Sequence, residues 1–220
     1  LITVRGQVPG RSQTSFARLL EQPGGGEADA AFAATGPDSI AKFLFTSGST
    51  KLPKAVITTQ RMLCANQQML LQTFPVFGEE PPVLVDWLPW NHTFGGSHNV
   101  GIVLYNGGTF YLDDGKPTAQ GFAETLRNLK EVSPTAYLTV PKGWEELVNA
   151  LEQDAELRAC FFKRMSLFFF AAAGLSQSLW DRLDRVAEQH CGARIRMMAA
   201  LGMTDAPPSC TFTPGRLSIA

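Results

Sequence analysis

Short apolar runs alternate with longer amphipathic stretches along most of this 220-residue chain. Runs of strand length occupy residues 41–45, 83–88, 109–112, 136–140, 167–172 and 194–200. Stretches of helix length occupy residues 58–73, 96–105, 118–132, 143–153 with a continuation to 165, and 176–191. Such alternation is typical of a mainly parallel sheet covered by helices on both faces. The sequence therefore predicts an α/β core over residues 40–220, preceded by a lead-in segment over residues 1–39.

Composition excludes several classes of protein. The formal net charge is −1, so nothing indicates a nucleic-acid partner or an anionic membrane surface. The four cysteines stand far apart with no C-x-x-C pair, which argues against a zinc knuckle or a disulfide scaffold and favours a reduced, cytoplasmic setting. The longest apolar run, residues 167–174, is too short to cross a bilayer. The oligomeric state stays open, with a homodimer as one option.

The run over residues 46–54 reads Thr-Ser-Gly-Ser-Thr-Lys-Leu-Pro-Lys and follows an apolar strand. Hydroxyls, free backbone N–H groups and lysines are what a loop needs to hold a polyphosphate. The Walker pattern is excluded, because Phe43 stands where its first glycine would be, five positions before Gly48. A polar surface loop is the alternative interpretation.

Three further segments follow predicted strands. The first, residues 88–96, is Leu-Pro-Trp-Asn-His-Thr-Phe-Gly-Gly. The second, residues 171–176, is Ala-Ala-Ala-Gly-Leu-Ser, and the third, residues 200–205, is Ala-Leu-Gly-Met-Thr-Asp. Ligands of parallel sheets sit beyond the carboxyl ends of the strands, so the first and third segments and the phosphate-type loop are expected to converge at one cleft. A structural histidine and glycine-containing turns are the alternative interpretations.

Together these motifs resemble the acyl-adenylate-forming (AMP-dependent synthetase/ligase) superfamily. The resemblance implies the large N-terminal α/β domain of an acyl-CoA synthetase, with ATP and magnesium as cofactors. By this resemblance, the nucleotide-binding residues are Thr46, Ser47, Gly48, Ser49, Thr50, Lys54, Ala172, Ala173, Gly174, Ala200, Leu201, Gly202 and Met203.

The resemblance also implies an acid site and a catalytic group. The residues beside the carboxylic acid would be Trp90, His92, Phe94 and Gly95. His92 would act in catalysis together with two residues of the last motif. Of these two, Thr204 would contact the α-phosphate and Asp205 would hold magnesium.

Three positions depart most from the superfamily pattern, and Ala55, in place of a common glycine, is a milder departure. Lys51 stands where a glycine is usual, Leu201 replaces an aromatic residue that stacks on adenine, and Asp205 is one methylene shorter than the usual glutamate. Because magnesium demands near-ideal octahedral geometry, the shorter carboxylate is expected to weaken the metal site or to bind through water.

The segments over residues 84–96, 106–109 and 113–117 look most like feruloyl-CoA synthetases. This resemblance implies an acid–thiol ligase that adenylates a hydroxycinnamic acid and then transfers it to CoA. It also leads us to expect that the chain is the ATP- and acid-binding part of a larger enzyme, without the C-terminal lobe and inactive alone. The open alternatives are a non-catalytic nucleotide-binding module and an adenylation domain for another acid.

Overall fold

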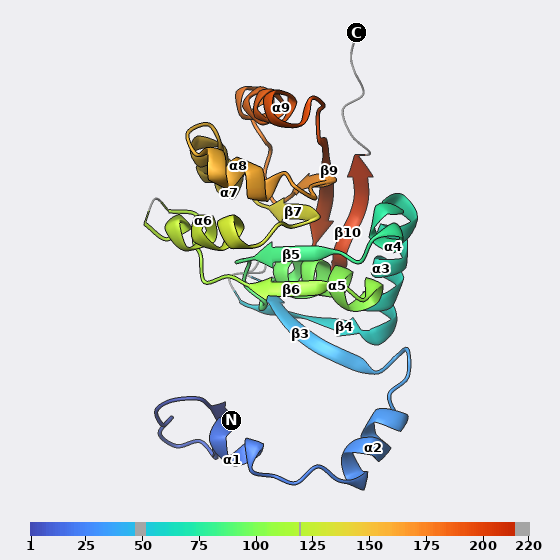
Figure 1. The fold of residues 1–220 in the computed structure, drawn as a ribbon. Helices are drawn as coiled ribbons and strands as arrows, with labels where there is room; N and C mark the ends of the chain where they lie inside the picture. The colour runs from blue at the N-terminus through green and yellow to red at the C-terminus, as the bar shows by residue number, and fades with distance from the viewer. Residues whose placement is uncertain (47–51, 119, 214–220) are drawn as a thin grey trace. The chain divides into compact units, whose positions relative to one another are not determined.

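A computed structural model describes residues 1–46, 52–118 and 120–213 (Figure 1). The chain divides into two compact units, Leu1–Pro37 and Asp38–Ala220. In the first unit, β1 (Ile2–Thr3) pairs in parallel with β2 (Thr14–Ser15). The helices of this unit are α1 (Phe16–Leu20) and α2 (Gly26–Ala33). Neither of these helices contains a buried residue, and both hydrophobic clusters of the described residues lie in the second unit.

The second unit is built on a four-stranded sheet in the order β10-β9-β8-β7. Its strands are β7 (Ala136–Thr139), β8 (Leu167–Phe170), β9 (Arg196–Met203) and β10 (Ala206–Thr213). The first three are parallel, and β10 is antiparallel to β9.

A second strand pair extends this layer beyond β7. It consists of the parallel strands β5 (Val83–Asp86) and β6 (Thr109–Leu112). The Thr135 N–H donates to the Val83 carbonyl oxygen at 3.0 Å, which joins β5 to the residue before β7.

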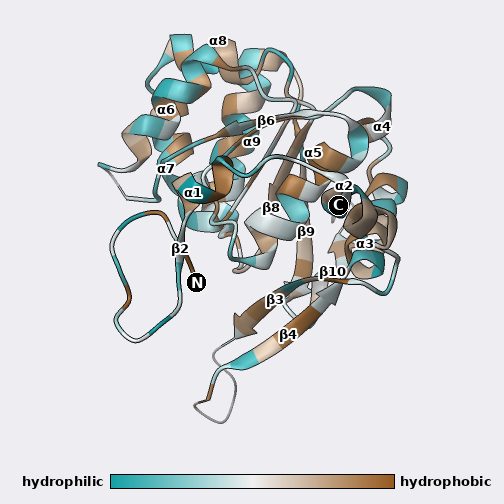
Figure 2. Ribbon diagram, turned by 90° about the horizontal axis from the view of Figure 1, so that it is seen from below, coloured by the Kyte–Doolittle hydropathy of each residue, from teal (hydrophilic) through white to brown (hydrophobic). Residues whose placement is uncertain are grey.

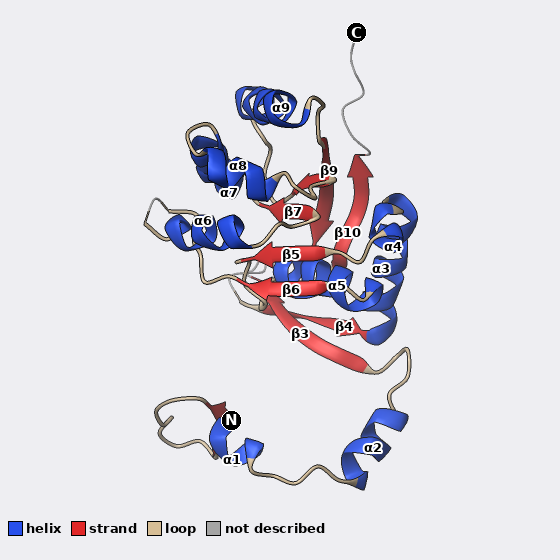
Figure 3. Cartoon of the chain, viewed as in Figure 1, coloured by secondary structure: helices blue, strands red, loops and turns tan. Residues whose placement is uncertain are grey.

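Helices cover both faces of these strands (Figures 1 and 3). On one side lie α6 (Phe122–Glu131), α7 (Pro141–Leu151), α8 (Ala155–Phe161) and α9 (Gln177–Cys191). On the other side lie α3 (Gln60–Thr73), α4 (Val76–Glu79), the π-helix η1 (Phe94–Asn99) and α5 (Val100–Asn106).

The core has two halves because successive strand side chains point to opposite faces. On β8, Phe168 joins the cluster under α6 to α9, whereas Phe169 joins the cluster under α3 to α5. On β7, Tyr137 and Leu138 divide in the same way. Strands that are buried on both faces need continuous apolar runs, as these are. The predicted α/β fold with helices on both faces is confirmed.

The sheets are mixed, because two strands fall outside the predicted alternation. The first, β4 (Lys54–Thr59), forms an antiparallel hairpin with β3 (Ile40–Thr46), so the expected helix begins at Gln60 rather than at Thr58. The second is β10, where two prolines in the sequence accompany shifts in the register with β9. Figure 2 shows hydrophobic residues along β3 and β4, and Phe45 of β3 is 71% exposed.

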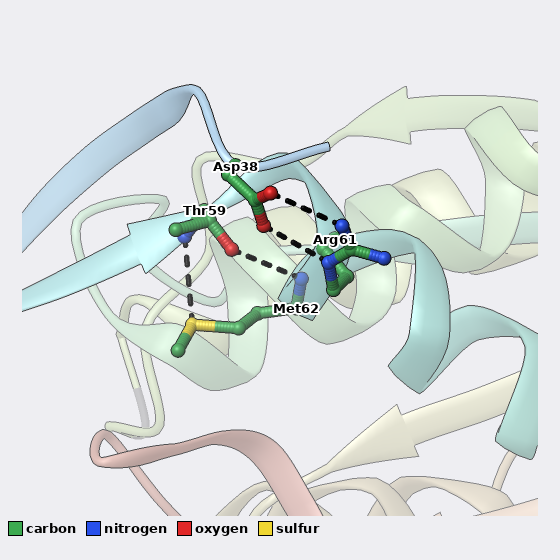
Figure 4. Close-up of polar contacts among 4 residues, drawn as sticks. All are labelled: Asp38, Thr59, Arg61 and Met62. Carbon is green, nitrogen blue, oxygen red and sulfur yellow. Dashed lines mark hydrogen bonds and ion pairs between the residues drawn. The ribbon is translucent and has the colours of Figure 1, made fainter. Parts of the chain in front are cut away.

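The junction between β4 and α3 is fixed by local hydrogen bonds (Figure 4). Thr59 is the N-cap, and its hydroxyl accepts from the Met62 N–H at 3.3 Å. Arg61 donates to both carboxylate oxygens of Asp38, at 3.0 and 3.1 Å. These bonds hold the pKa of the Asp38 carboxyl below its ordinary value. The start of the helix is thereby tied to the segment just before β3.

Candidate functional site

Two of the predicted motifs meet through an ion pair. Lys54 begins β4, and Asp205 lies in the turn between β9 and β10. Lys54 Nζ and Asp205 Oδ1 are 2.8 Å apart. Thr46, at the end of β3, pairs with Lys54 across the hairpin. The end of the phosphate-type loop and the last motif therefore lie together.

Most of the phosphate-type loop lies outside the described residues. This applies to the nucleotide-binding predictions at Ser47, Gly48, Ser49 and Thr50, and to Lys51. The flanking strands correct one expectation about the loop. It connects two antiparallel strands, β3 and β4, and does not run from a strand directly toward a helix.

The last motif divides between a strand and a turn. Residues 200–203 belong to β9, and Thr204 and Asp205 form the turn into β10, since Met203 pairs with Ala206. Leu201 and Met203 are 62% and 49% exposed. The segment that was expected to follow a strand is therefore itself mostly strand.

Asp205 is the predicted magnesium ligand. Across residues 1–46, 52–118 and 120–213, no group of three or more His, Cys, Asp and Glu side chains could hold a metal. A single carboxylate still suits magnesium that arrives on phosphates, because Mg²⁺ in nucleotide sites takes one or two carboxylates together with substrate oxygens. The residues present thus fit a magnesium–nucleotide complex better than a dedicated metal site.

A small cavity of about 50 Å³ brings the other predicted segments together. Exposed residues from three segments line its mouth: His92, Ala172 and Gly202. Buried rings line its inner end: Phe94, His98 and Phe169. The segments at residues 90–96, 171–176 and 200–205 thus converge on one cavity whose inner end is aromatic.

One wall of the cavity is held by a contact between α3 and β10. Ser209 of β10 lines the cavity and is buried. Its carbonyl oxygen accepts a hydrogen bond from Asn66 Nδ2 of α3 at 3.1 Å. The helix that follows the β3–β4 hairpin thereby fixes the strand that follows the last motif.

Gly95 and Gly96 serve the packing of the π-helix. A Cβ on Gly96 would lie 1.9 Å from the Trp90 carbonyl oxygen, and one on Gly95 would lie 2.7 Å from that of Leu88. Both glycines therefore allow η1 to pack against the loop at residues 88–90. The Trp90 ring lies against Phe110, with 5.9 Å between the ring centroids.

The π-helix itself points to a functional region. Helical turns of this kind occur frequently at functional sites. Here η1 supplies Phe94 and His98 to the cavity. The sequence predicted only an ordinary helix, starting at Gly96.

The small-residue segment carries an unusual backbone conformation. Ala172 has φ +77°, a left-handed conformation that costs a non-glycine residue about 1–2 kcal/mol. Ala172 lines the mouth of the cavity, whereas Ala173 and Gly174 are exposed. Strain of this kind clusters at ligand sites, where the surrounding structure holds it in place.

A buried polar chain beside the cavity was not predicted from the sequence. The carboxylate of Asp86 accepts from the Leu88 N–H and from Asn99 Nδ2, each at 2.9 Å. Asn99 Oδ1 lies 2.9 Å from Nδ1 of His98. Burial raises the pKa of Asp86 to about 6 and lowers the pKa of His98 to about 4. The available signal was the polar triplet at residues 97–99, just after the predicted acid-binding residues.

Lys42 is another residue that sequence reasoning missed. Its Nζ donates to the Gly96 carbonyl oxygen at 2.8 Å, which joins β3 to the π-helix. Burial lowers the pKa of this lysine. Its signal in the sequence was a lone cation inside an apolar run.

Comparison with known proteins identifies the family. The model of the family described as "AMP-binding enzyme" matches residues 6–219. The chain belongs to the AMP-binding enzyme family.

Individual members of the AMP-binding enzyme family are distant in sequence. Carboxylic acid reductase of Mycobacterium marinum is 30% identical over 122 residues, which cover 55% of this chain and 10% of that protein. The peroxisomal long chain acyl-CoA synthetase 6 of Arabidopsis thaliana is 26% identical over 177 residues, which cover 74% of this chain and 23% of that protein.

A solved structure similar to this chain agrees with the fold. The long-chain-fatty-acid-CoA ligase of Archaeoglobus fulgidus matches with a TM-score of 0.61 at 25% identity, covering 80% of this chain and 33% of that one. The chain spans 10% of the reductase and 23% of the synthetase named above. Among the helices of the described residues, none is both long and apolar enough to cross a membrane.

Proposed function

We propose that this chain forms the ATP- and acid-binding core of an acid–thiol ligase that adenylates an aromatic, hydroxycinnamic-type acid and transfers it to CoA. One observation carries the proposal: the ion pair between Lys54 and Asp205 forms at the hairpin whose Gly202 lines the mouth of the cavity. A cation for phosphate, from β4, and a carboxylate for magnesium, from the β9–β10 turn, are thus held beside a segment that borders a site for an organic acid.

The proposed first step is attack of the acid's carboxylate on the α-phosphorus of ATP. Both reactants are anions, so the site must screen their repulsion and hold them in line. Lys54 would neutralise the pyrophosphate end, Thr204 would donate to the α-phosphate, and Asp205 would hold the magnesium carried by the nucleotide. The attacking acid is already ionised at neutral pH, so this step needs no general base.

His92 is proposed to border the reacting carboxylate. It is exposed at the cavity mouth, and its Nδ1 accepts a hydrogen bond from the Phe94 N–H at 3.2 Å. That bond leaves Nε2 as the ring nitrogen able to contact a ligand. The same position would flank the thiol of CoA in the transfer step.

The aromatic substrate is supported by the inner end of the cavity. The centroids of Phe94 and Phe169 are 5.8 Å apart, and those of His98 and Phe169 are 4.9 Å apart. A cavity that ends on buried rings suits a short, flat acid. A long aliphatic acid, as in the names of the long-chain relatives, is the second candidate, and it would require this inner end to open.

The test is pyrophosphate release from ATP and magnesium, measured separately with ferulate, a long-chain fatty acid and phenylalanine. We expect release with ferulate and not with the other two acids in the longer protein that contains this chain, whereas the 220-residue chain by itself is expected to bind without release. Binding of ATP by the longer protein without release for any acid would favour the non-catalytic module. Release with only the fatty acid or only phenylalanine would overturn the aromatic assignment and keep adenylation.

A further inference from the structure

His98 is buried, yet one of its ring nitrogens lacks a partner. The side chain is 1% exposed, and Nε2 makes no hydrogen bond to any of the described residues. A buried acceptor without a partner destabilises the fold, because no hydrogen bond replaces the one that it gave up with water. Such an atom needs an explanation, and a ligand group is one.

The hydrogen-bond chain behind His98 fixes which nitrogen is free. Asp86 is an acceptor, so Asn99 must direct its Nδ2 donor to Asp86 Oδ2, 2.9 Å away. Asn99 therefore presents its carbonyl oxygen Oδ1 to Nδ1 of His98, and Nδ1 must carry the proton of that 2.9 Å bond. In the neutral ring, Nε2 is then an acceptor and not a donor.

The neutral form of the ring is maintained by its surroundings. Burial lowers the pKa of His98 to about 4. The imidazole therefore stays uncharged at neutral pH, and its lone pair on Nε2 remains available.

The ring lies at the inner end of the cavity. His98 lines the cavity together with Phe94 and Phe169, whose centroids are 5.5 and 4.9 Å from its own. Both neighbouring rings are apolar, so the unpaired Nε2 belongs to the polar ring among the three. An acid that enters with its carboxylate at the mouth, near His92, would bring its far end to His98.

We propose that Nε2 of His98 accepts a hydrogen bond from a hydroxyl group at the far end of the acid, so that the site selects phenolic acids. This inference rests on the proposed function, and it names the chemical feature by which that site recognises its substrate. A methyl ether has no hydrogen to donate, and an unsubstituted ring leaves Nε2 unpaired. Both analogues are therefore bound more weakly than the phenol.

The experiment measures binding of three matched acids to the 220-residue chain by calorimetry: para-hydroxycinnamate, para-methoxycinnamate and cinnamate. We expect the phenol to bind roughly tenfold more tightly than either analogue, a difference of about 1.4 kcal/mol. The methoxy compound is larger than the phenol and cinnamate is smaller, so an affinity that rises or falls steadily with ligand size cannot account for a loss in both.

Two variants separate the nitrogen from the ring. His98→Phe keeps an aromatic ring packed against Phe94 and Phe169 but removes the acceptor, so the preference for the phenol should disappear. His98→Gln keeps an amide oxygen near the position of Nε2, so part of the preference should remain. Circular dichroism of both variants checks that they fold.

A spectroscopic measurement on the unaltered chain tests the proposal even if the variants fail to fold. The chain has three histidines, so the ¹⁵N resonance of His98 Nε2 can be followed individually. It should shift toward the hydrogen-bonded value with the phenol and not with the methoxy compound. Equal binding of all three acids, with no such shift, would overturn the inference and leave the proposed function intact. Failure of all three acids to bind would overturn both.

Discussion

Lys54 Nζ lies 2.8 Å from Asp205 Oδ1, although 151 positions separate the two residues in the sequence. Their side chains are 64% and 50% exposed. Exposed ion pairs contribute about 0–1 kcal/mol to stability, so either partner can be removed or redirected with little effect on the fold. Under the proposed function, a bound nucleotide would take over both groups.

Lys54→Gln should weaken ATP binding without destabilising the chain. A hydrogen bond to a charged group is worth about 1.5–3 kcal/mol, which corresponds to a loss of roughly tenfold to a hundredfold in affinity. Calorimetric titration with ATP measures the affinity, and thermal unfolding measures the stability. Lys142→Gln is the matched control, since Lys142 also forms an exposed ion pair, with Glu145 at 2.9 Å. An equal loss of ATP affinity in both variants would contradict the assignment of Lys54.

Asp205→Asn should change the affinity for ATP in opposite directions with and without magnesium. In excess chelator, the variant should bind ATP more tightly than the natural chain, because it removes a negative charge and frees Lys54. With magnesium present it should bind more weakly, because the carboxylate ligand of the metal is lost. Titrations with ATP under both conditions test this reversal of sign. Weaker binding under both conditions would show that Asp205 contacts the nucleotide rather than the metal.

Asp86 and His98 should give opposite pH dependences of stability. Burial raises the pKa of Asp86 to about 6, so its stabilising contribution is complete below its unfolded value and is lost as the pH rises through about 6. Burial lowers the pKa of His98 to about 4, so its contribution is complete above its unfolded value and is lost as the pH falls through about 4. Between these limits the two effects oppose each other.

Single substitutions should therefore reveal each effect separately. Asp86→Asn should make the free energy of unfolding fall more steeply on acidification than in the natural chain, and His98→Gln should make it fall less steeply. Each change is on the order of 2–3 kcal/mol between about pH 7 and about pH 4, at about 1.36 kcal/mol per pKa unit. Urea denaturation across this range measures it. Identical pH slopes in both variants and the natural chain would be incompatible with this account.

Gly96→Ala should destabilise the second unit. The added Cβ would lie 1.9 Å from the Trp90 carbonyl oxygen, so either the π-helix or the loop at residues 88–90 must move. Overpacking typically lowers the free energy of unfolding by about 1–3 kcal/mol. Because the added Cβ would meet backbone atoms, which move less easily than side chains, we expect a value near the upper end of that range. Gly174→Ala is the control, because its Cβ would meet nothing within 4 Å. Denaturant midpoints of the two variants should differ clearly, and equal midpoints would contradict the observed packing.

The parts of the fold that the sequence predicted well are short apolar strands, of which β7 and β8 are buried throughout. Residues 109–112 form β6 as predicted, and β5, β7 and β8 begin at the predicted residues. Their apolar runs are bounded by turns, so their existence and type follow from local pattern. The helix α9 was equally clear, with Ser176 as N-cap and Gly192 in the left-handed conformation after its end.

The parts that were missed depend on non-local structure. The strand β4 is partly exposed, and its sequence merges with the start of α3, so no local pattern separates the two. The prolines of β10 argue against a strand, yet β9 holds that segment in an irregular pairing. His98 bonds to Asn99 of the same π-helix, Asn99 bonds to Asp86 of β5, and the Phe169 ring that contacts His98 comes from β8. Only the assembled layers bring these residues together.

The hydrogen bond from Asn66 Nδ2 to the Ser209 carbonyl oxygen has a consequence for the order in which the protein folds. It connects α3 to β10 across 143 positions, and it holds the cavity wall that Ser209 forms. Closing a loop of this length costs conformational entropy before any stabilising contact forms. Folding is slower in proteins whose contacting residues are farther apart in the sequence. The cavity wall can therefore be completed only after residue 209 has been synthesised. We expect the nucleus of β5 to β8 and its helices to form first, and ligand-binding competence to be gained in the last and slowest step of folding.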